Sequence, residues 1–386
     1  MKRNDLSRCL VAFDQNTTLV SVVELSLASW LVAGVVPELT RQPLKKLRTD
    51  PDALLALLLR WRDQATKAGA TIKRIVVAFE AGRDGFWLAR WLRSRGIEAY
   101  VIHPTSIPVS REHRRAKTDR LDAGLLMRAL LGWLRGEPKH CSMAQIPSIA
   151  EEDLRRPNRE HQTLVGEQTR VVNRMKSTLI RFGIRNFKVK LRQASKHLEE
   201  LRGPEGEPLP LNTIAELRRD LARLLLIREQ IREIERVRLE RLKQAPRKGT
   251  HAMVRMLAAI LGIGIETADM LVHEVLSRNL RDQRATARYG GLTGAPDESG
   301  TKRREKGLAR AGNARVRRGM IQLAWRWLMF QKSSALAQWY QARTAGGKPG
   351  LRKAMIVALA RKLLIALWRY IKTGEAPTGA VLRPAT

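Results

Sequence analysis

The sequence predicts an α/β domain at the N-terminus followed by a long all-helical remainder. Before about residue 150, short apolar runs of strand length alternate with amphipathic helical stretches, whereas beyond it most apolar runs have helical spacing. The 386 residues, of which 44% are hydrophobic, are enough for two or three packed domains. We expect these domains to span residues 1–150, 151–250 and 251–386.

The N-terminal domain is expected to begin with three strands. Residues 8–14 and 18–24 are β-rich runs joined by the polar turn 15–17, and residues 30–36 extend this meander. A helix at 50–68 follows, with Asp50 as its cap and Pro51 at its first position. Further elements alternate along the chain, as a strand at 72–80, a helix at 83–95 and a strand at 97–104. This order, completed by a helix after residue 118, is typical of an RNase H-like sheet, although other mixed α/β folds share it.

The middle region is expected to be a helical insert with a coiled-coil seam. A long helix is predicted at 159–182, ending near Gly183. A second helix carries apolar residues at spacings of three and four, namely Leu217, Leu221, Leu224, Ile227, Ile231 and Ile234. Arginines occupy much of its remaining surface. A solvated face with ion pairs, contact with phosphates and self-association are all compatible with this pattern.

The C-terminal region contains the segment MLAAILGIGIETADMLVHEV, which predicts two helices around a glycine hairpin. Gly262 and Gly264 would allow backbone N–H groups to approach a phosphate, as in a helix–hairpin–helix. A tight turn between two core helices explains a single GxG nearly as well.

The charge of the chain indicates a nucleic-acid partner. Lys and Arg total 72 against 37 Asp and Glu, which gives a net charge of +35. Such a balance produces salt-sensitive binding to phosphates. An anionic membrane surface is the alternative partner, but no apolar run reaches the length of about 18 residues needed for a span. We expect a soluble cytoplasmic protein. Its two cysteines, Cys9 and Cys141, exclude a cysteine-based zinc site.

Four acidic residues stand out against this basic background as a candidate metal site. Asp14 and Glu80 each close an apolar run that is predicted to be a strand, while Asp119 and Asp122 lie three residues apart on one predicted helical face. Carboxylates are the ligands that Mg²⁺ or Mn²⁺ prefers, and two bound ions can stabilise both oxygens of a phosphodiester displacement. Individually, each residue would more often be a surface charge, and Asp119 and Asp122 would suit any helix N-terminus.

Ser299 is a second candidate, because it lies in the glycine-flanked segment APDESGTKRREKG between acidic and basic residues. A serine beside cations could attack a phosphate once its hydroxyl is activated, although a loop serine is usually only a turn residue. The segment after it is strongly basic and is expected to contact a nucleic-acid backbone through Arg303, Arg304, Lys306, Arg310, Arg315, Arg317 and Arg318. Asn313 is expected to cap the helix that follows.

These motifs together resemble the DEDD transposases of the IS110 insertion-sequence family, which are bridge-RNA-guided recombinases. VAFD, FEAGRDGFWLARWLRSRGIEAYVIHP and RRAKTDRLDAGLL are similar to the family's RuvC-like domain. GIGIETADMLVHEV and GGLTGAPDESGTKRREKGLARAGNARVRRGMIQLAW are similar to its C-terminal transposase domain. The resemblance covers nearly the whole length, and the basic helical insert fits the family's coiled coil. The acidic pair Asp297 and Glu298 departs from the family pattern and leaves Thr301 and Thr293 as alternatives to Ser299.

The resemblance implies a metal-dependent DNA recombinase. Asp14, Glu80, Asp119 and Asp122 would bind the metal, and Ser299 would form a covalent link to DNA. The protein would form a homodimer that assembles into a homotetramer, and a noncoding guide RNA would pair with donor and target DNA. Two other functions fit the residues themselves. One is a Holliday-junction type nuclease that uses the acids and water, and the other is a catalytically inactive nucleic-acid-binding protein.

Overall fold

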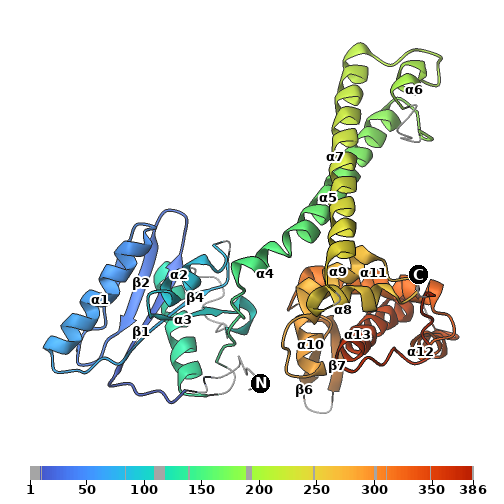
Figure 1. Cartoon of the computed structure of the whole chain (residues 1–386). Coiled ribbons are helices and arrows are strands. Elements are labelled where there is room, and N and C mark those ends of the chain that lie inside the picture. Colours follow the sequence, from blue (N-terminus) through green and yellow to red (C-terminus); the bar gives the residue numbers. More distant parts are fainter. Residues whose placement is uncertain are drawn as a thin grey trace. The chain divides into compact units, whose positions relative to one another are not determined.

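The computed structural model divides the chain into two compact units, residues 1–148 and residues 149–386 (Figure 1). It describes residues 9, 11–82, 84–107, 118–137, 140–187, 194–246, 248–299, 302–309, 311–347 and 349–384. The expected helical insert and the C-terminal helices both fall in the second unit. No helix in these described ranges has the length and apolar character needed to cross a membrane.

The first unit is built on a five-stranded mixed sheet in the order β3-β2-β1-β4-β5. Strands β2 and β3 are antiparallel to their neighbours, whereas β1, β4 and β5 run parallel to one another. The strands are β1 (Thr18–Leu25), β2 (Trp30–Val35), β3 (Leu44–Leu47), β4 (Arg74–Glu80) and β5 (Glu98–Ile102). This topology is compatible with the predicted RNase H-like sheet.

Helices cover both faces of this sheet. Apolar residues alternate along β1, so Leu19 and Val23 pack with α1 (Pro51–Lys67) and α2 (Trp87–Arg93) on one face. Val20 and Val22 pack on the other face with α3 (Asp119–Leu134). The expected cap of α1 is confirmed, since the Asp50 carboxylate accepts from the backbone N–H groups of Asp52 and Ala53. A short 3₁₀ turn, η1 (Pro104–Ser106), follows β5.

The first predicted strand is wrong, because residues 11–14 lie in irregular structure and turns before β1. The strand formed by 18–25 takes the central place instead, with six consecutive buried residues. The third strand, β3, was not predicted because its sequence, LKKL, is mostly polar and exposed.

The second unit is helical apart from one hairpin. Helices α5 (Arg156–Arg181) and α7 (Leu211–Gln244) pack side by side as an arm, with α6 (Ala194–Glu200) near its far end (Figure 1). The apolar seam of α7 faces α5, since Leu217, Leu221, Leu224 and Ile227 are buried against Leu164, Val171 and Met175. Helix packing in the arm is thus confirmed, while a regular coiled coil stays a prediction.

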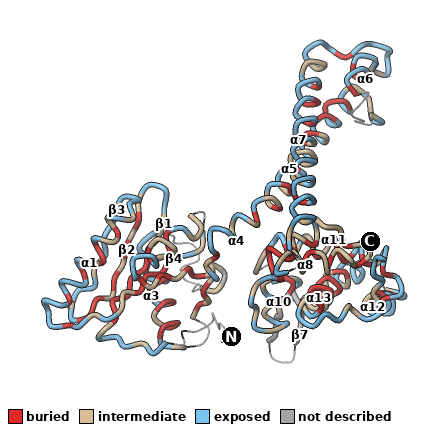
Figure 2. Tube along the Cα trace, in the orientation of Figure 1, coloured by how far each residue is buried: buried red, intermediate tan, exposed pale blue. Residues whose placement is uncertain are grey.

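The arm is joined to a body of helices with its own core (Figure 2). Its elements are α8 (Gly249–Ala258), α9 (Ile265–Leu271), the π-helical turn η2 (Val272–Leu276), α10 (Gln283–Tyr289), α11 (Ala314–Phe330), α12 (Ala335–Thr344) and α13 (Pro349–Thr373). The hairpin consists of β6 (Gly294–Ser299) and β7 (Lys302–Leu308), and the short α4 (Ile149–Asp153) precedes the arm. The overall prediction of an α/β domain followed by helices is confirmed.

Buried ionic groups tie the arm to this body. Glu274, only 1% exposed, accepts from Arg159 Nε of the arm at 3.0 Å and from Asn313 Nδ2 at 3.0 Å. Burial opposes ionisation of Glu274, but these donors outweigh it, and the pKa of the carboxyl is lowered. Asn313 also caps α11 as predicted, by accepting from the backbone N–H groups of Arg315 and Val316. One carboxylate therefore links the base of the arm to the start of α11.

Candidate active site

Two glutamates occupy adjacent positions where the parallel strands β1 and β4 end. The register pairs Val23 with Phe79, so the next residues along the two strands are Glu24 and Glu80. Neighbouring strands lie about 4.8 Å apart, which brings the two side chains to the same edge of the sheet. Both point to the face covered by α3, because side chains alternate and Val22 and Ala78 belong to that core.

Asp119 and Asp122 lie in the first turn of α3, which packs on the face to which both glutamates point. Near the other end of this helix, Trp133 packs at a tilt against Tyr100 of β5, with ring centroids 4.9 Å apart. The Tyr100 hydroxyl donates to Glu98, which pairs with Arg74 at the start of β4. A metal site shared with Glu24 and Glu80 requires the first turn of this 16-residue helix to lie at the carboxyl ends of the strands. Thr118 caps this turn, since its hydroxyl accepts from the backbone N–H of Leu121 at 3.3 Å.

Only oxygen ligands are available from these four acids, and such a set suits Mg²⁺ or Mn²⁺ better than Zn²⁺. Glu80 and Asp119 are exposed, and Glu24 and Asp122 are half-buried, so all four can be reached from solvent. In the structure no three of their carboxylates come within 4.8 Å of one another. The donor chemistry fits a divalent metal. The first turn of α3 would have to approach the strand ends for all four carboxylates to coordinate one metal centre.

The structure does not place Asp14, a predicted metal ligand, beside Glu80. Asp14 lies in the turn that leads into β1, where its carboxylate accepts from Thr17 Oγ1 at 2.8 Å and from the Asn16 N–H at 3.0 Å. These hydrogen bonds, the one from Thr17 above all, lower its pKa. Thr17 O accepts from the backbone N–H of Arg74, at the start of β4. The six residue steps to Glu80 separate the two acids by roughly 20 Å.

Glu24 was missed although it ends an apolar run that was itself predicted to be a strand. The runs LVAFD and TLVSVVE both close on an acid, and both have strand composition. Only the pairing of strands tells which acid lies beside Glu80. The structure selects Glu24, ten residues after the predicted position.

Ser299 is the last residue of β6 and lies directly opposite Lys302 of β7, so the expected loop is a β-hairpin. The hairpin was hidden by its hydrophilic sequence and by Pro296. Its register places Asp297 opposite Arg304 and Glu298 opposite Arg303.

The other predicted nucleic-acid contacts fall into three groups. Arg303, Arg304 and Lys306 lie on β7, and Arg310 lies outside the described residues. Arg315 and Arg318 are exposed on the first turns of α11. Arg317 is half-buried, with its guanidinium against the backbone at Gly291.

Gly262 and Gly264 lie between α8 and α9, as predicted. Gly262 has φ +90°, and a Cβ atom there would come within 2.9 Å of Phe330 Cβ. The carbonyls of this turn accept from the Gln331 side chain and from Arg383, so it is fastened to the rest of the body. The core-turn interpretation explains Gly262 but not Gly264, which has φ −83° and open space around it. Phosphate binding there stays a prediction.

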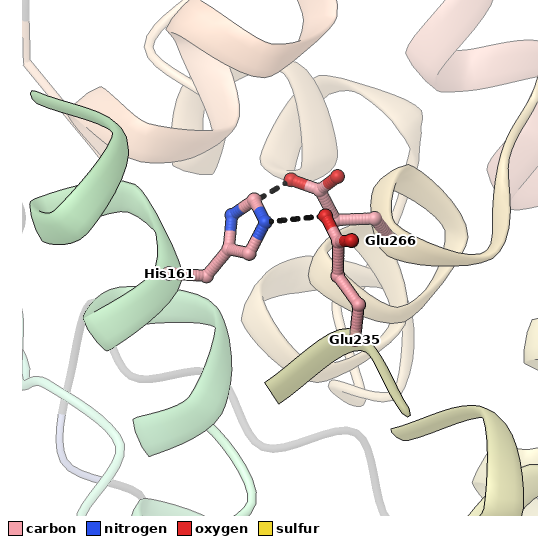
Figure 3. Close-up of side chains that lie close together, drawn as sticks. All are labelled: His161, Glu235 and Glu266. Carbon is pink, nitrogen blue, oxygen red and sulfur yellow. Dashed lines mark hydrogen bonds and ion pairs between the residues drawn. The ribbon is translucent and has the colours of Figure 1, made fainter. Parts of the chain in front are cut away.

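One further cluster joins three helices of the second unit. His161 lies between Glu235 and Glu266, with Nε2 3.0 Å from the first carboxylate and Nδ1 3.1 Å from the second (Figure 3). The ring is buried, while both glutamates are half exposed. Hydrogen bonding to Glu266, and then to Glu235, raises the pKa of His161 against the effect of burial. Since the two ring nitrogens bond different carboxylates, the arrangement is that of a protonated imidazole in an ion triad.

Comparisons with known proteins agree with this picture. Residues 254–341, which include Ser299, match the family described as "Transposase IS116/IS110/IS902 family". Residues 37–183, which include Glu80, Asp119 and Asp122, match the family DEDD_Tnp_IS110, described as "Transposase". Over 383 residues the chain is 40% identical to a protein of Sinorhizobium fredii (strain NBRC 101917 / NGR234) named "Putative transposase y4rJ", covering 97% of this chain and 96% of that protein. The chain belongs to the IS110 family of transposases.

Proposed function

We propose that this transposase cuts and rejoins DNA at a divalent-metal site formed by Glu24, Glu80, Asp119 and Asp122. The observation that carries the proposal is the register of β1 and β4, which sets two glutamates side by side at the carboxyl ends of the strands. Asp119 and Asp122 begin α3, which packs on the same face of the sheet and supports their inclusion. Mg²⁺ or Mn²⁺ bound there would polarise the scissile phosphate and stabilise the leaving oxygen. The carboxylates hold the ion and orient the phosphate.

Ser299 is the proposed nucleophile. Its Oγ attacks the scissile phosphorus, a P–O bond of the DNA strand breaks, and the released strand oxygen takes a proton. The serine proton passes to a nearby carboxylate. The resulting phosphoserine keeps the bond energy, so a strand hydroxyl can later displace the serine without ATP. The place of Ser299 at the end of β6, followed in the sequence by a strongly basic segment, supports this role.

The acids and Ser299 belong to different units of the chain. A complete site therefore requires the two units to meet on DNA, within one chain or between chains of a homodimer or homotetramer. We also propose that a noncoding guide RNA from the element selects donor and target by base pairing. The net charge of +35 and the arginine-rich arm support binding of this much nucleic acid.

The test combines a covalent-adduct assay with a matched pair of acid variants. Purified protein, RNA transcribed from the flanks of the element, a labelled DNA substrate and Mg²⁺ are mixed, then quenched in denaturant. Wild-type protein should yield a protein–DNA adduct that Ser299→Ala abolishes. Glu24→Gln should lower the cleavage rate at least about 100-fold, since even outer-shell partners of a metal contribute 10–100-fold.

Asp14→Asn is the control for Glu24→Gln, because it also removes one carboxylate but at the opposite edge of the sheet. It should leave the cleavage rate within a few-fold of wild type. A loss with Asp14→Asn and normal cleavage with Glu24→Gln would refute the proposed site. Cleavage without an adduct in wild type and in Ser299→Ala alike would instead favour a resolvase-like nuclease that uses water.

A further inference from the structure

A groove lies in the second unit between the arm and the body. It has a volume of about 390 Å³ and is bounded by α5 on one side and α11 on the other, with α9 as its floor. None of the residues that line it is a Phe, Tyr or Trp. Neither the acids of the first unit nor Ser299 is among the residues that line it.

The α11 wall of the groove carries a row of cations. Arg315, Arg318, Gln322 and Arg326 recur at spacings of three and four, so they form one exposed stripe along the helix. No ion pair or hydrogen bond involves the guanidinium of Arg315 or Arg318 within the described residues. Over eleven residues the stripe extends about 16 Å. The groove thus offers charge along its length without acids to neutralise most of it.

The α5 wall is uncharged and contains an unexplained glycine. Gln162, Val165, Gly166 and Thr169 face the groove from the interior of a 26-residue helix. Glycine is the least favourable residue in a helix interior after proline. A Cβ at Gly166 would meet only the end of the Arg170 side chain, at 3.8 Å. Packing within the chain therefore gives no reason for glycine, whereas clearance for a bound ligand does.

The floor contributes one acid, Glu266, which is already engaged by His161. Three arginines against this one carboxylate leave the groove cationic. A cationic groove without aromatic platforms suits a nucleic-acid backbone rather than stacked bases. Walls on two sides exclude a duplex, whose phosphates are met on an open surface, and admit a single strand.

We propose that the groove between α5 and α11 holds the sugar-phosphate backbone of a single nucleic-acid strand, with Arg315, Arg318 and Arg326 on its phosphates and Gly166 providing room. This inference rests on the proposed function, in which strands are separated and exchanged. It adds a binding site apart from the cleavage chemistry. Contacts to phosphates carry no base information, so strand binding through these arginines should depend little on sequence.

The test measures binding without cleavage, so that its failure differs from failure of the proposed function. A fluorescein-labelled 20-mer of oligothymidylate is titrated in EDTA by anisotropy at several salt concentrations. Each phosphate contact on a single strand contributes about 0.7 to the slope of log K against log salt. The double variant Arg315→Gln/Arg318→Gln removes two such contacts and should reduce the magnitude of the slope by about 1.4. Arg343→Gln, an exposed arginine of α12, controls for the loss of net charge and should leave most of the slope.

Gly166 variants separate the groove from a general basic surface. Gly166→Gln should weaken oligothymidylate binding about tenfold, yet raise the unfolding temperature of the protein, since Gln favours helices. A variant that is more stable but binds less cannot be explained by damage to the fold. An unchanged slope in the arginine variant would overturn the proposal. So would normal binding by Gly166→Gln, or an equal loss for a blunt duplex, because both would place the arginines on an open surface.

Discussion

The ion triad at His161 predicts a stability that depends on pH in a defined direction. Replacing His161 with Ala removes two charge-assisted hydrogen bonds, at 3.0 and 3.1 Å. Bonds to charged groups contribute about 1.5–3 kcal/mol each, and the lower limit applies because both glutamates are half exposed and regain water. The expected cost at pH 6 is therefore about 3 kcal/mol.

The sign of the pH dependence follows from the raised pKa of His161. A raised pKa means that the contribution is complete below the unfolded value of 6.5 and is lost as the pH rises through the folded pKa. A neutral imidazole has one N–H and can donate to one carboxylate only. The cost of His161→Ala should therefore fall to about 1.5 kcal/mol at pH 9.

Urea unfolding at pH 6 and pH 9, followed by circular dichroism, measures this difference. Unfolding of the first unit is an internal reference, because His161 belongs to the second. His197→Ala is the control variant, since His197 pairs with Glu200 on an exposed surface, where such pairs contribute about 0–1 kcal/mol. An equal cost of His161→Ala at both pH values would refute the protonated triad.

Three further outcomes are expected. The Asp220 carboxylate is 2% exposed and accepts from Arg174 Nε at 2.7 Å. Asp220→Asn should therefore lower the stability of the arm by about 2–3 kcal/mol, which hydrogen exchange of α5 and α7 would measure. Its lowered pKa makes this contribution present at neutral pH and lost as the pH falls through the folded value, so the two proteins should converge in acid. Gly262→Ala should lower the free energy of unfolding by about 1–3 kcal/mol in thermal unfolding, because the added Cβ would meet Phe330. Gly346→Ala is the control, since Gly346 has φ +71° and open space around it, and it should cost about 1 kcal/mol from backbone strain alone. EDTA should stop DNA cleavage while leaving oligothymidylate binding unchanged, and cleavage that persists in EDTA would contradict a metal-dependent reaction.

Local sequence patterns predicted most of the first unit. The strand at 74–80 and the helix at 51–67 carry strong apolar periodicity and, for the helix, a capping residue, so their positions follow from nearby residues alone. Strand β3 and the hairpin β6–β7 were missed because their residues are largely polar, and their pairing depends on neighbours brought by the fold.

The sequence predicted the kind of site, a group of carboxylates for a divalent metal, but not every residue that forms it. Glu80 ends a strong strand and was predicted, whereas Glu24 was not, because two successive runs that end in an acid look alike until one of them pairs with β4. The His161 triad had no counterpart in the sequence, since its glutamates lie 74 and 105 residues further along the chain. Such contacts are set by helix packing over distances that no local pattern reaches.

Glu274 has a consequence for how the second unit gains its structure. Its buried charge is paired with Arg159 and accepts a hydrogen bond from Asn313, and these two residues are 154 positions apart. The arm is therefore part of the same cooperative folding unit as the helices beneath it. Deleting the arm would leave an ionised carboxylate in the interior without its cation, and opening its base would loosen the cap of α11. The arm cannot be trimmed away as an independent appendage.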